Sequence, residues 1–182
     1  MNFLWRQAVY RDVARHSAQP RWIQLAIDVG AGFFIFALVA SAVFDSRIRV
    51  LHALQALIYL AVMVGSRRGS AWAFGAGCFV AAFWNYTNLF VTTFVRAGIH
   101  QLGLLVTTGR VPRPDLLIAV FAAGGHFLLI LGCLAGLLRT RPAGRDWIRF
   151  TVGGVLAIAY LVAIIATTGR QYVPLLRLVF HL

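Results

Sequence analysis

Polar side chains recur at regular spacing inside two of the most apolar stretches of this sequence. In each stretch they stand at positions i, i+3 and i+7: His52, Gln55 and Tyr59 in one, and Asn85, Asn88 and Thr92 in the next. This spacing places the members of each stripe on one face of an α-helix. Imidazole, amide, phenol and hydroxyl groups in apolar surroundings either hydrogen-bond one another or serve a ligand, a proton or an ion.

The two stripes should also lie at similar depth, because consecutive helices that run in opposite directions each rise about 1.5 Å per residue. His52 would then lie level with Asn88, and Gln55 near Asn85. Two interpretations are open. The simpler is a set of interhelical hydrogen bonds, each worth roughly 1 kcal/mol or less. The other is a binding site or pathway lined by both stripes.

His126 stands near the middle of a later apolar run, directly after Gly124 and Gly125. Glycines permit close approach of another helix or of a flat ligand. We expect His126 to be helical and buried, with a structural hydrogen bond to an amide, hydroxyl or carbonyl group, or a role in haem, quinone or proton chemistry. The candidate ligand-binding residues are therefore His52, Gln55, Tyr59, Asn85, Asn88 and His126.

A bis-histidine haem b site would need two imidazoles at nearly equal depth on facing helices. His52 lies near one end of its run and His126 near the middle of another, so they differ by roughly 9 Å along the helix axes at about 1.5 Å per residue. His100 is expected at the membrane interface, and His16 and His181 are close to the termini. We predict no cofactor, with haem b as an open alternative.

The sequence predicts neither a metal site nor a catalytic residue. Cys78 and Cys133 stand alone inside apolar runs, where they are expected to pack as small hydrophobic side chains, a redox pair being the alternative. P-loop, HExxH and GxSxG motifs are missing, and no two carboxylates are spaced for acid-base catalysis. We therefore do not expect an enzyme.

The composition indicates which elements carry these residues. Of the 182 residues, 60% are hydrophobic and 12% are charged, a balance that is not typical of a soluble domain. Five apolar runs are long enough to cross a bilayer, and backbone groups in lipid must be satisfied within helices. The sequence predicts an all-α, polytopic integral membrane protein with one five-helix transmembrane domain over residues 23–168. The predicted spans are 23–44, 48–65, 71–95, 116–138 and 148–168.

Three segments that flank the predicted spans are expected to lie at the membrane interface. Residues 1–22 form a basic amphipathic segment, residues 96–115 an amphipathic helix ended by prolines, and residues 169–182 a tail that rests on the bilayer. The remaining connections are short, which predicts that consecutive spans pack as antiparallel neighbours.

All seventeen basic residues are arginines, and the net charge is +12. They stand at the ends of apolar runs, where contact with membrane lipid headgroups explains them, so we predict no nucleic-acid partner. The N-terminal segment and the 66–70 and 139–149 loops hold ten of the seventeen. This bias favours a cytoplasmic N-terminus, and we expect the cytoplasmic (inner) membrane of a bacterium.

Three functions are compatible with this sequence. The leading hypothesis is a non-catalytic membrane subunit or accessory protein that forms homo- or hetero-oligomers, because Gly132 with Gly136, and Gly153 with Ala157, have a spacing that lets helices pack closely within the chain or against a partner. The alternative is a component that binds or transports a small molecule, lipid or ion at the polar stripes, which requires a cavity beside them. A haem b- or quinone-binding membrane anchor is the second alternative.

Overall fold

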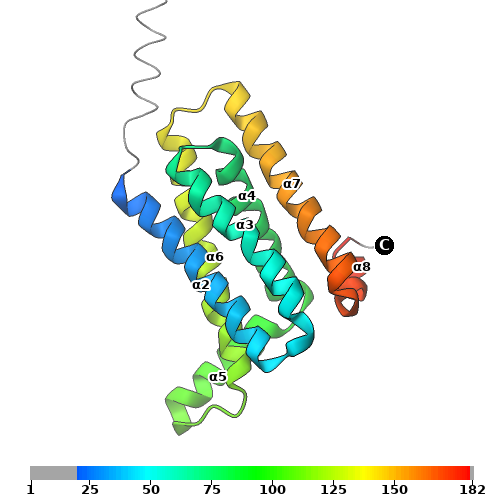
Figure 1. Ribbon diagram of the computed structural model, residues 1–182. Coiled ribbons are helices and arrows are strands. Elements are labelled where there is room, and N and C mark those ends of the chain that lie inside the picture. Colours follow the sequence, from blue (N-terminus) through cyan, green and yellow to red (C-terminus); the bar gives the residue numbers. More distant parts are fainter. Residues whose placement is uncertain (1–19, 181–182) are drawn as a thin grey trace, which may run out of the picture.

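The computed structural model describes residues 20–180, which form a bundle of helices (Figure 1). The helices are α2 (Arg21–Phe44), α3 (Arg49–Arg67), α4 (Ala71–Tyr86), α5 (Phe94–Thr108), α6 (Pro114–Arg139), α7 (Gly144–Thr168) and α8 (Val173–Phe180). Short 3-10 turns occupy Ser46–Ile48 and Arg170–Tyr172, and a π-helical turn occupies Thr87–Val91. Within residues 20–180 the structure has no strand, so the all-α prediction is confirmed there; most of the predicted segment 1–22 lies outside the described residues.

Four helical segments are long and apolar enough to cross a membrane, namely Arg21–Phe44, Ser46–Arg67, Pro114–Arg139 and Gly144–Thr168. The segments Ala71–Val91 and Phe94–Thr108 would bring the number to five if they are counted together as one span, although they meet at a bend of 73°. Four of the five predicted runs therefore correspond to single continuous helical segments.

The predicted third run, 71–95, is wrong at its end, because the chain leaves the helix at Thr92. The backbone of Thr92 is extended, and its hydroxyl group lies 3.3 Å from Asn88 Oδ1 and 3.4 Å from the backbone nitrogen of Phe94. A threonine side chain that bonds nearby backbone in this way competes with the helical pattern. Residues 94 and 95 consequently belong to α5.

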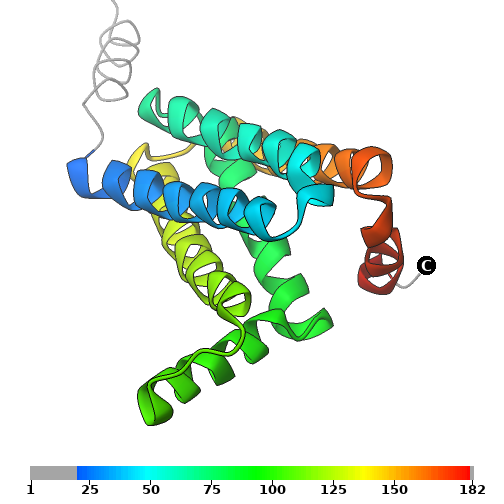
Figure 2. The same ribbon diagram turned by 60° about the horizontal axis from the view of Figure 1, so that its bottom comes forward.

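Helix α5 lies at one end of the bundle (Figure 2), where it packs on the first turns of α6. It ends at Gly109, whose φ of 67° is the left-handed conformation typical of a glycine C-cap. The prediction that prolines end this helix is wrong: Pro114 instead begins α6, where its missing N–H costs nothing.

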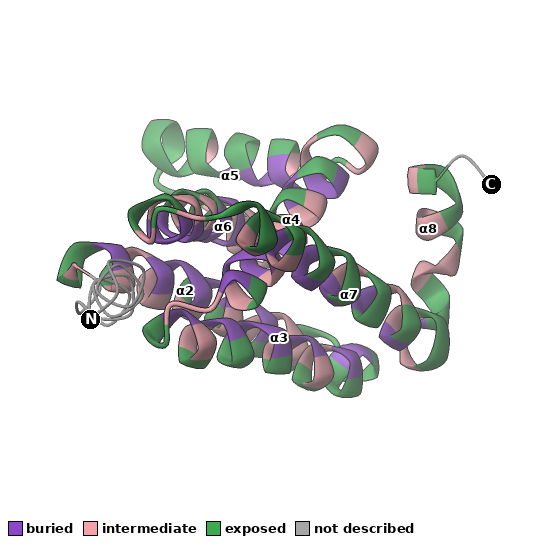
Figure 3. Ribbon diagram, turned by 90° about the horizontal axis from the view of Figure 1, so that it is seen from above, coloured by how far each residue is buried: buried purple, intermediate pink, exposed green. Residues whose placement is uncertain are grey.

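The most extensive helix pairs are α2 with α6 and α4 with α7. The predicted packing of consecutive spans holds for α2 with α3 and for α3 with α4, but it is wrong for α6 and α7, which pack chiefly on α2 and α4, respectively. Buried faces turn toward the middle of the bundle in the view from above (Figure 3).

Glycines explain which helices pair most closely. A Cβ atom on Gly75 of α4 would overlap the backbone of Phe150 in α7. A Cβ atom on Gly30 of α2 would lie only 2.6 Å from the carbonyl oxygen of Gly125 in α6. At both contacts only glycine lets the two backbones touch.

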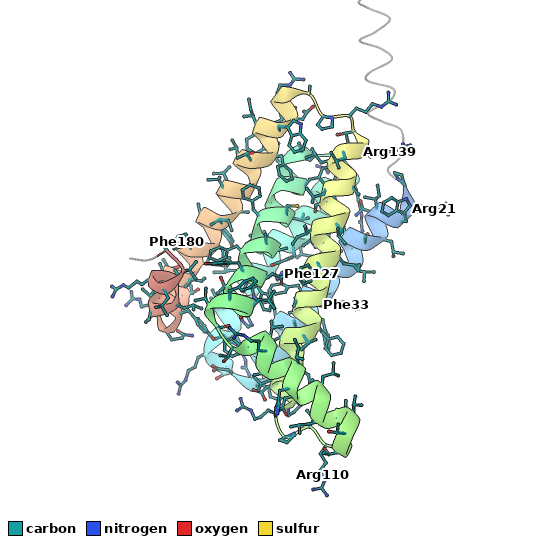
Figure 4. All side chains as sticks on the ribbon, turned by 180° about the vertical axis from the view of Figure 1, so that it is seen from behind. Arg21, Phe33, Arg110, Phe127, Arg139 and Phe180 are labelled. Carbon is teal, nitrogen blue, oxygen red and sulfur yellow. The ribbon has the colours of Figure 1, made fainter. Side chains whose placement is uncertain are left out.

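The outer faces of the bundle are apolar, and arginines gather at its two ends. Phe36 and Leu131 are 65% and 67% exposed. Arg21 and Arg139 lie toward one end of the molecule, and Arg110 lies at the far tip of α5 (Figure 4).

Candidate functional site

A cavity of about 390 Å³ lies in the half of the bundle next to the 45–47 loop. Its walls come from α2, α3, the end of α4 with its π turn, α6 and α7, and α8 closes one side. Most of the lining is apolar and includes Phe34, Leu38, Leu51, Phe83, Trp84, Ala122 and Leu161. Both the size and this composition are typical of small-molecule sites.

Uncharged polar side chains line the cavity from three elements. Helix α3 contributes His52 and Gln55, the π turn contributes Thr87 and Asn88, and α2 contributes Ser41. Three of these, His52, Gln55 and Asn88, are candidate residues from the sequence, and the structure brings them to the same space. A π turn carries an extra residue relative to an α-helical turn and often occurs at functional sites.

The geometry of His52 and Asn88 defines what they can offer to a ligand. The Nδ1 atom of His52 lies 2.9 Å from the carbonyl oxygen of Leu38, which can only accept, so Nδ1 carries the proton and Nε2 of the neutral ring is an acceptor. Asn88 donates from Nδ2 to the carbonyl oxygen of Trp84 at 3.0 Å. Its amide is thereby held in place within the turn.

Thr87 was not among the residues predicted from the sequence. Its side chain is buried, and its hydroxyl oxygen has no hydrogen-bond partner among the described residues. An unpaired buried hydroxyl costs free energy, and although Thr87 lines the cavity, this oxygen is sealed from it. Nothing in the sequence distinguishes Thr87 from the other threonines, because its position depends on the π turn.

The two polar stripes do not join as the simpler interpretation requires. Asn85 is buried but does not line the cavity, and neither of its amide atoms has a hydrogen-bond partner within residues 20–180. The predicted contact of Gln55 with Asn85 is therefore not a hydrogen bond. Tyr59 turns instead to His126, on a different helix.

His126 is fully buried, and its Nε2 atom lies 2.8 Å from the phenol oxygen of Tyr59. Three aromatic rings surround it, with centroid distances of 4.0 Å to Phe34, 4.9 Å to Trp84 and 5.6 Å to Tyr59. The prediction of a helical, buried and hydrogen-bonded His126 is confirmed, although its partner is a phenol. Four helices each contribute one ring to this aromatic cluster.

Of the two glycines before His126, only one marks a close helix contact. A Cβ atom on Gly125 would lie 2.9 Å from the carbonyl oxygen of Gly30, as predicted. A Cβ atom on Gly124 would meet nothing within 4 Å, so the same prediction is wrong for Gly124, which faces outward.

His52 and His126 do not face each other across a shared space. His52 lines the cavity, whereas His126 lies behind Phe34 and Trp84, which line it. The pairing that a bis-histidine haem requires is thus not seen for these two residues. Across the described part of the chain, no group of three or more His, Cys, Asp or Glu side chains is placed to hold a metal ion.

Charged and phenolic groups stand near the edge of the cavity. Asp115 accepts two hydrogen bonds from the guanidinium group of Arg113, at 2.9 and 2.7 Å, and Asp45 accepts one from the backbone N–H of Arg47. Burial raises the pKa of Tyr172, and the nearby Asp45 carboxylate raises it further. Tyr172 therefore stays a neutral phenol at physiological pH.

Helix α8 contributes Leu175, Leu176 and Val179 to the lining of the cavity. These residues belong to the tail that was expected to rest on the bilayer. One face of the tail instead packs toward the cavity, while Leu178 is 65% exposed.

The small-residue pairs that suggested a docking surface pack inside this chain. A Cβ atom on Gly132 would lie 3.1 Å from the backbone nitrogen of Ile27 in α2, and one on Gly153 would overlap the backbone of Trp72 in α4. Ala157 is also buried. These faces are already occupied by the chain's own helices.

Comparison of the chain with known protein families, with curated proteins and with solved structures found no match.

Proposed function

We propose that this chain is a multi-pass membrane protein that binds a small amphipathic molecule in the cavity next to the 45–47 loop. The observation that carries the proposal is the cavity of about 390 Å³, with its apolar walls and its few polar groups, beside the predicted polar stripes. The sequence hypothesis of a binding or transport component required such a cavity.

The outer surface supports the membrane part of this proposal. The bundle exposes large apolar side chains along its helices, among them Phe36, Val43 and Leu131. A contiguous apolar surface of this kind is unfavourable in water and favourable in lipid. Helix α2, with 24 residues, is about 36 Å long at 1.5 Å per residue, which suffices to cross a hydrocarbon core of about 30 Å.

The chain offers a matched pair of alanines to test the cavity as a binding site. Ala119 lines the cavity, so Ala119→Phe fills part of it. Ala82 of α4 is exposed, so Ala82→Phe adds the same volume on the outside. We expect a small amphiphile to copurify with the wild-type chain and with Ala82→Phe, and to be lost from Ala119→Phe while that variant stays folded.

The measurement is native mass spectrometry and solvent extraction of protein released gently into mild detergents and nanodiscs, with circular dichroism to report folding. A bare protein mass in every preparation would contradict the proposal. Undiminished binding by a folded Ala119→Phe variant would also contradict it, because the ligand would then lie elsewhere. The visible absorption spectrum of the same samples reports haem.

A further inference from the structure

Two uncharged polar side chains in the cavity lining keep a group free for a ligand. Gln55 is 7% exposed, and its amide has no hydrogen-bond partner among the described residues. His52 adds the acceptor Nε2, since its Nδ1 proton points to Leu38. Together they can both donate to and accept from one ligand group.

The charged side chains in the cavity lining are either already paired or exposed. Asp115 is already paired with Arg113 through two hydrogen bonds. Asp45 is exposed at the edge of the cavity. A charged ligand head moved inward to Gln55 and His52 would lose its hydration and meet only uncharged partners, which is costly. A hydroxyl head would instead find the hydrogen bonds it lost in water.

We infer that the cavity selects an amphiphile with an uncharged, hydroxyl-bearing head on an apolar chain, and that Gln55 and His52 recognise this head. The inference rests on the proposed function, since it assigns the ligand class of the same cavity. The apolar chain lies against the aromatic and aliphatic wall that includes Trp84 and Leu161.

Trp84 provides a direct optical readout, because it lines the cavity. The chain has five tryptophans, and changing Trp5, Trp22, Trp72 and Trp147 to Phe leaves Trp84 as the single fluorophore. In nanodiscs, this protein is titrated with three probes that share one brominated dodecyl chain: the 1-alkanol, the alkylsulfonate and the alkyltrimethylammonium ion. Bromine quenches a tryptophan that it approaches closely, so saturable quenching reports occupancy of the cavity.

The alkanol is expected to bind at least about tenfold more tightly than either charged probe, and Gln55→Leu to weaken alkanol binding by about tenfold, as for one lost hydrogen bond to a buried partner. Thr107→Val is the control for a polar-to-apolar change outside the cavity, since Thr107 is exposed on α5 and bonds its own helix at the Gly103 carbonyl. It should leave binding unchanged. If Gln55→Leu does not fold, the comparison of probes on the single-tryptophan chain decides.

The failures of the two proposals are distinguishable. Equal or tighter saturable binding of a charged probe overturns the inference about the head, while the cavity remains a binding site. A folded Gln55→Leu variant with unchanged alkanol affinity overturns the role of Gln55. No saturable quenching by any of the three probes overturns the proposed function itself, and the inference with it.

Discussion

The half of the bundle next to the 66–70 loop and the half next to the 45–47 loop are built from the same helices, yet they pack differently. In the first half, α4 and α7 touch backbone to backbone at Gly75 and Gly153. In the second half, the same two helices contribute Trp84 and Leu161 to the walls of a cavity. The same two helices are therefore in backbone contact in one half and line a cavity in the other.

The two halves also differ in how fully their polar side chains are hydrogen-bonded. Near the 66–70 loop, Gln24 of α2 donates to the hydroxyl group of Ser66 in α3 at 3.1 Å, and Arg67 forms an ion pair with Asp28 at 3.1 Å. Near the 45–47 loop, His52 also joins two helices through its bond to the Leu38 carbonyl, but the amide of Gln55 has no hydrogen-bond partner among the described residues. The half with the cavity thus keeps a polar side chain available, as a binding site requires.

The largest expected effect comes from breaking the close-packed half. Gly75→Ala places a methyl group against the Phe150 backbone, which cannot move aside as a flexible side chain could. We expect a loss of about 3 kcal/mol or more in the free energy of unfolding, measured by denaturant titration in detergent with circular dichroism.

Gly124→Ala is the control, because its methyl group meets nothing within 4 Å. It should change stability by less than about 1 kcal/mol, and in the stabilising direction, since alanine is the better helix former. Equal losses for the two variants would show that the α4–α7 contact is not the tight one.

An intermediate effect is expected where the two halves meet, at the hydrogen bond between Tyr59 and His126. Tyr59→Phe removes the phenol oxygen and leaves Nε2 of the buried imidazole unpaired. We expect a loss of about 1–3 kcal/mol. His126→Leu leaves the phenol unpaired and should cost a similar amount.

The double variant isolates this contact. Once both partners are apolar, neither is left unpaired, so the double variant should be more stable than the sum of the two single losses predicts. Additive losses, measured by the same denaturant titrations, would mean that Tyr59 and His126 act independently.

The apolar runs predicted the helices because length and hydropathy are local properties. Residues 23–44 became Arg21–Phe44, and 116–138 became Pro114–Arg139. The burial of His126 was also predictable, since an imidazole in the middle of an apolar run needs a polar partner.

The packing order and the cavity could not be predicted in this way. The sequence shows Gly75 and Gly153, but not that they face the backbones of Phe150 and Trp72, because this depends on how whole helices cross. The π turn at Thr87–Val91 lies just before Thr92, where the chain leaves the helix, and no residue type in the sequence predicts such a turn. Thr87 was missed for this reason, and Asn85 was assigned to the site although it lies outside the cavity lining.

The smallest expected effect separates two buried polar residues, Asn85 and Gln55. Both amide atoms of Asn85 lack a hydrogen-bond partner among the described residues, and the side chain is 4% exposed. Replacing an unpaired amide by an apolar group of similar size removes a desolvation cost, so Asn85→Leu should raise the free energy of unfolding by up to about 1 kcal/mol.

Asn85→Leu should at the same time leave amphiphile binding unchanged, because Asn85 does not line the cavity. Gln55→Leu should also preserve or slightly raise the stability of the empty protein, yet weaken binding. Denaturant titration and Trp84 quenching, applied to both variants, give the four values needed. If Asn85→Leu instead lowers stability, the amide of Asn85 has a partner such as a buried water in the wild-type protein. The polar groups of the half with the cavity would then be paired as fully as those of the close-packed half. If it weakens binding, the site extends beyond the cavity lining to the face of α4 that carries Asn85.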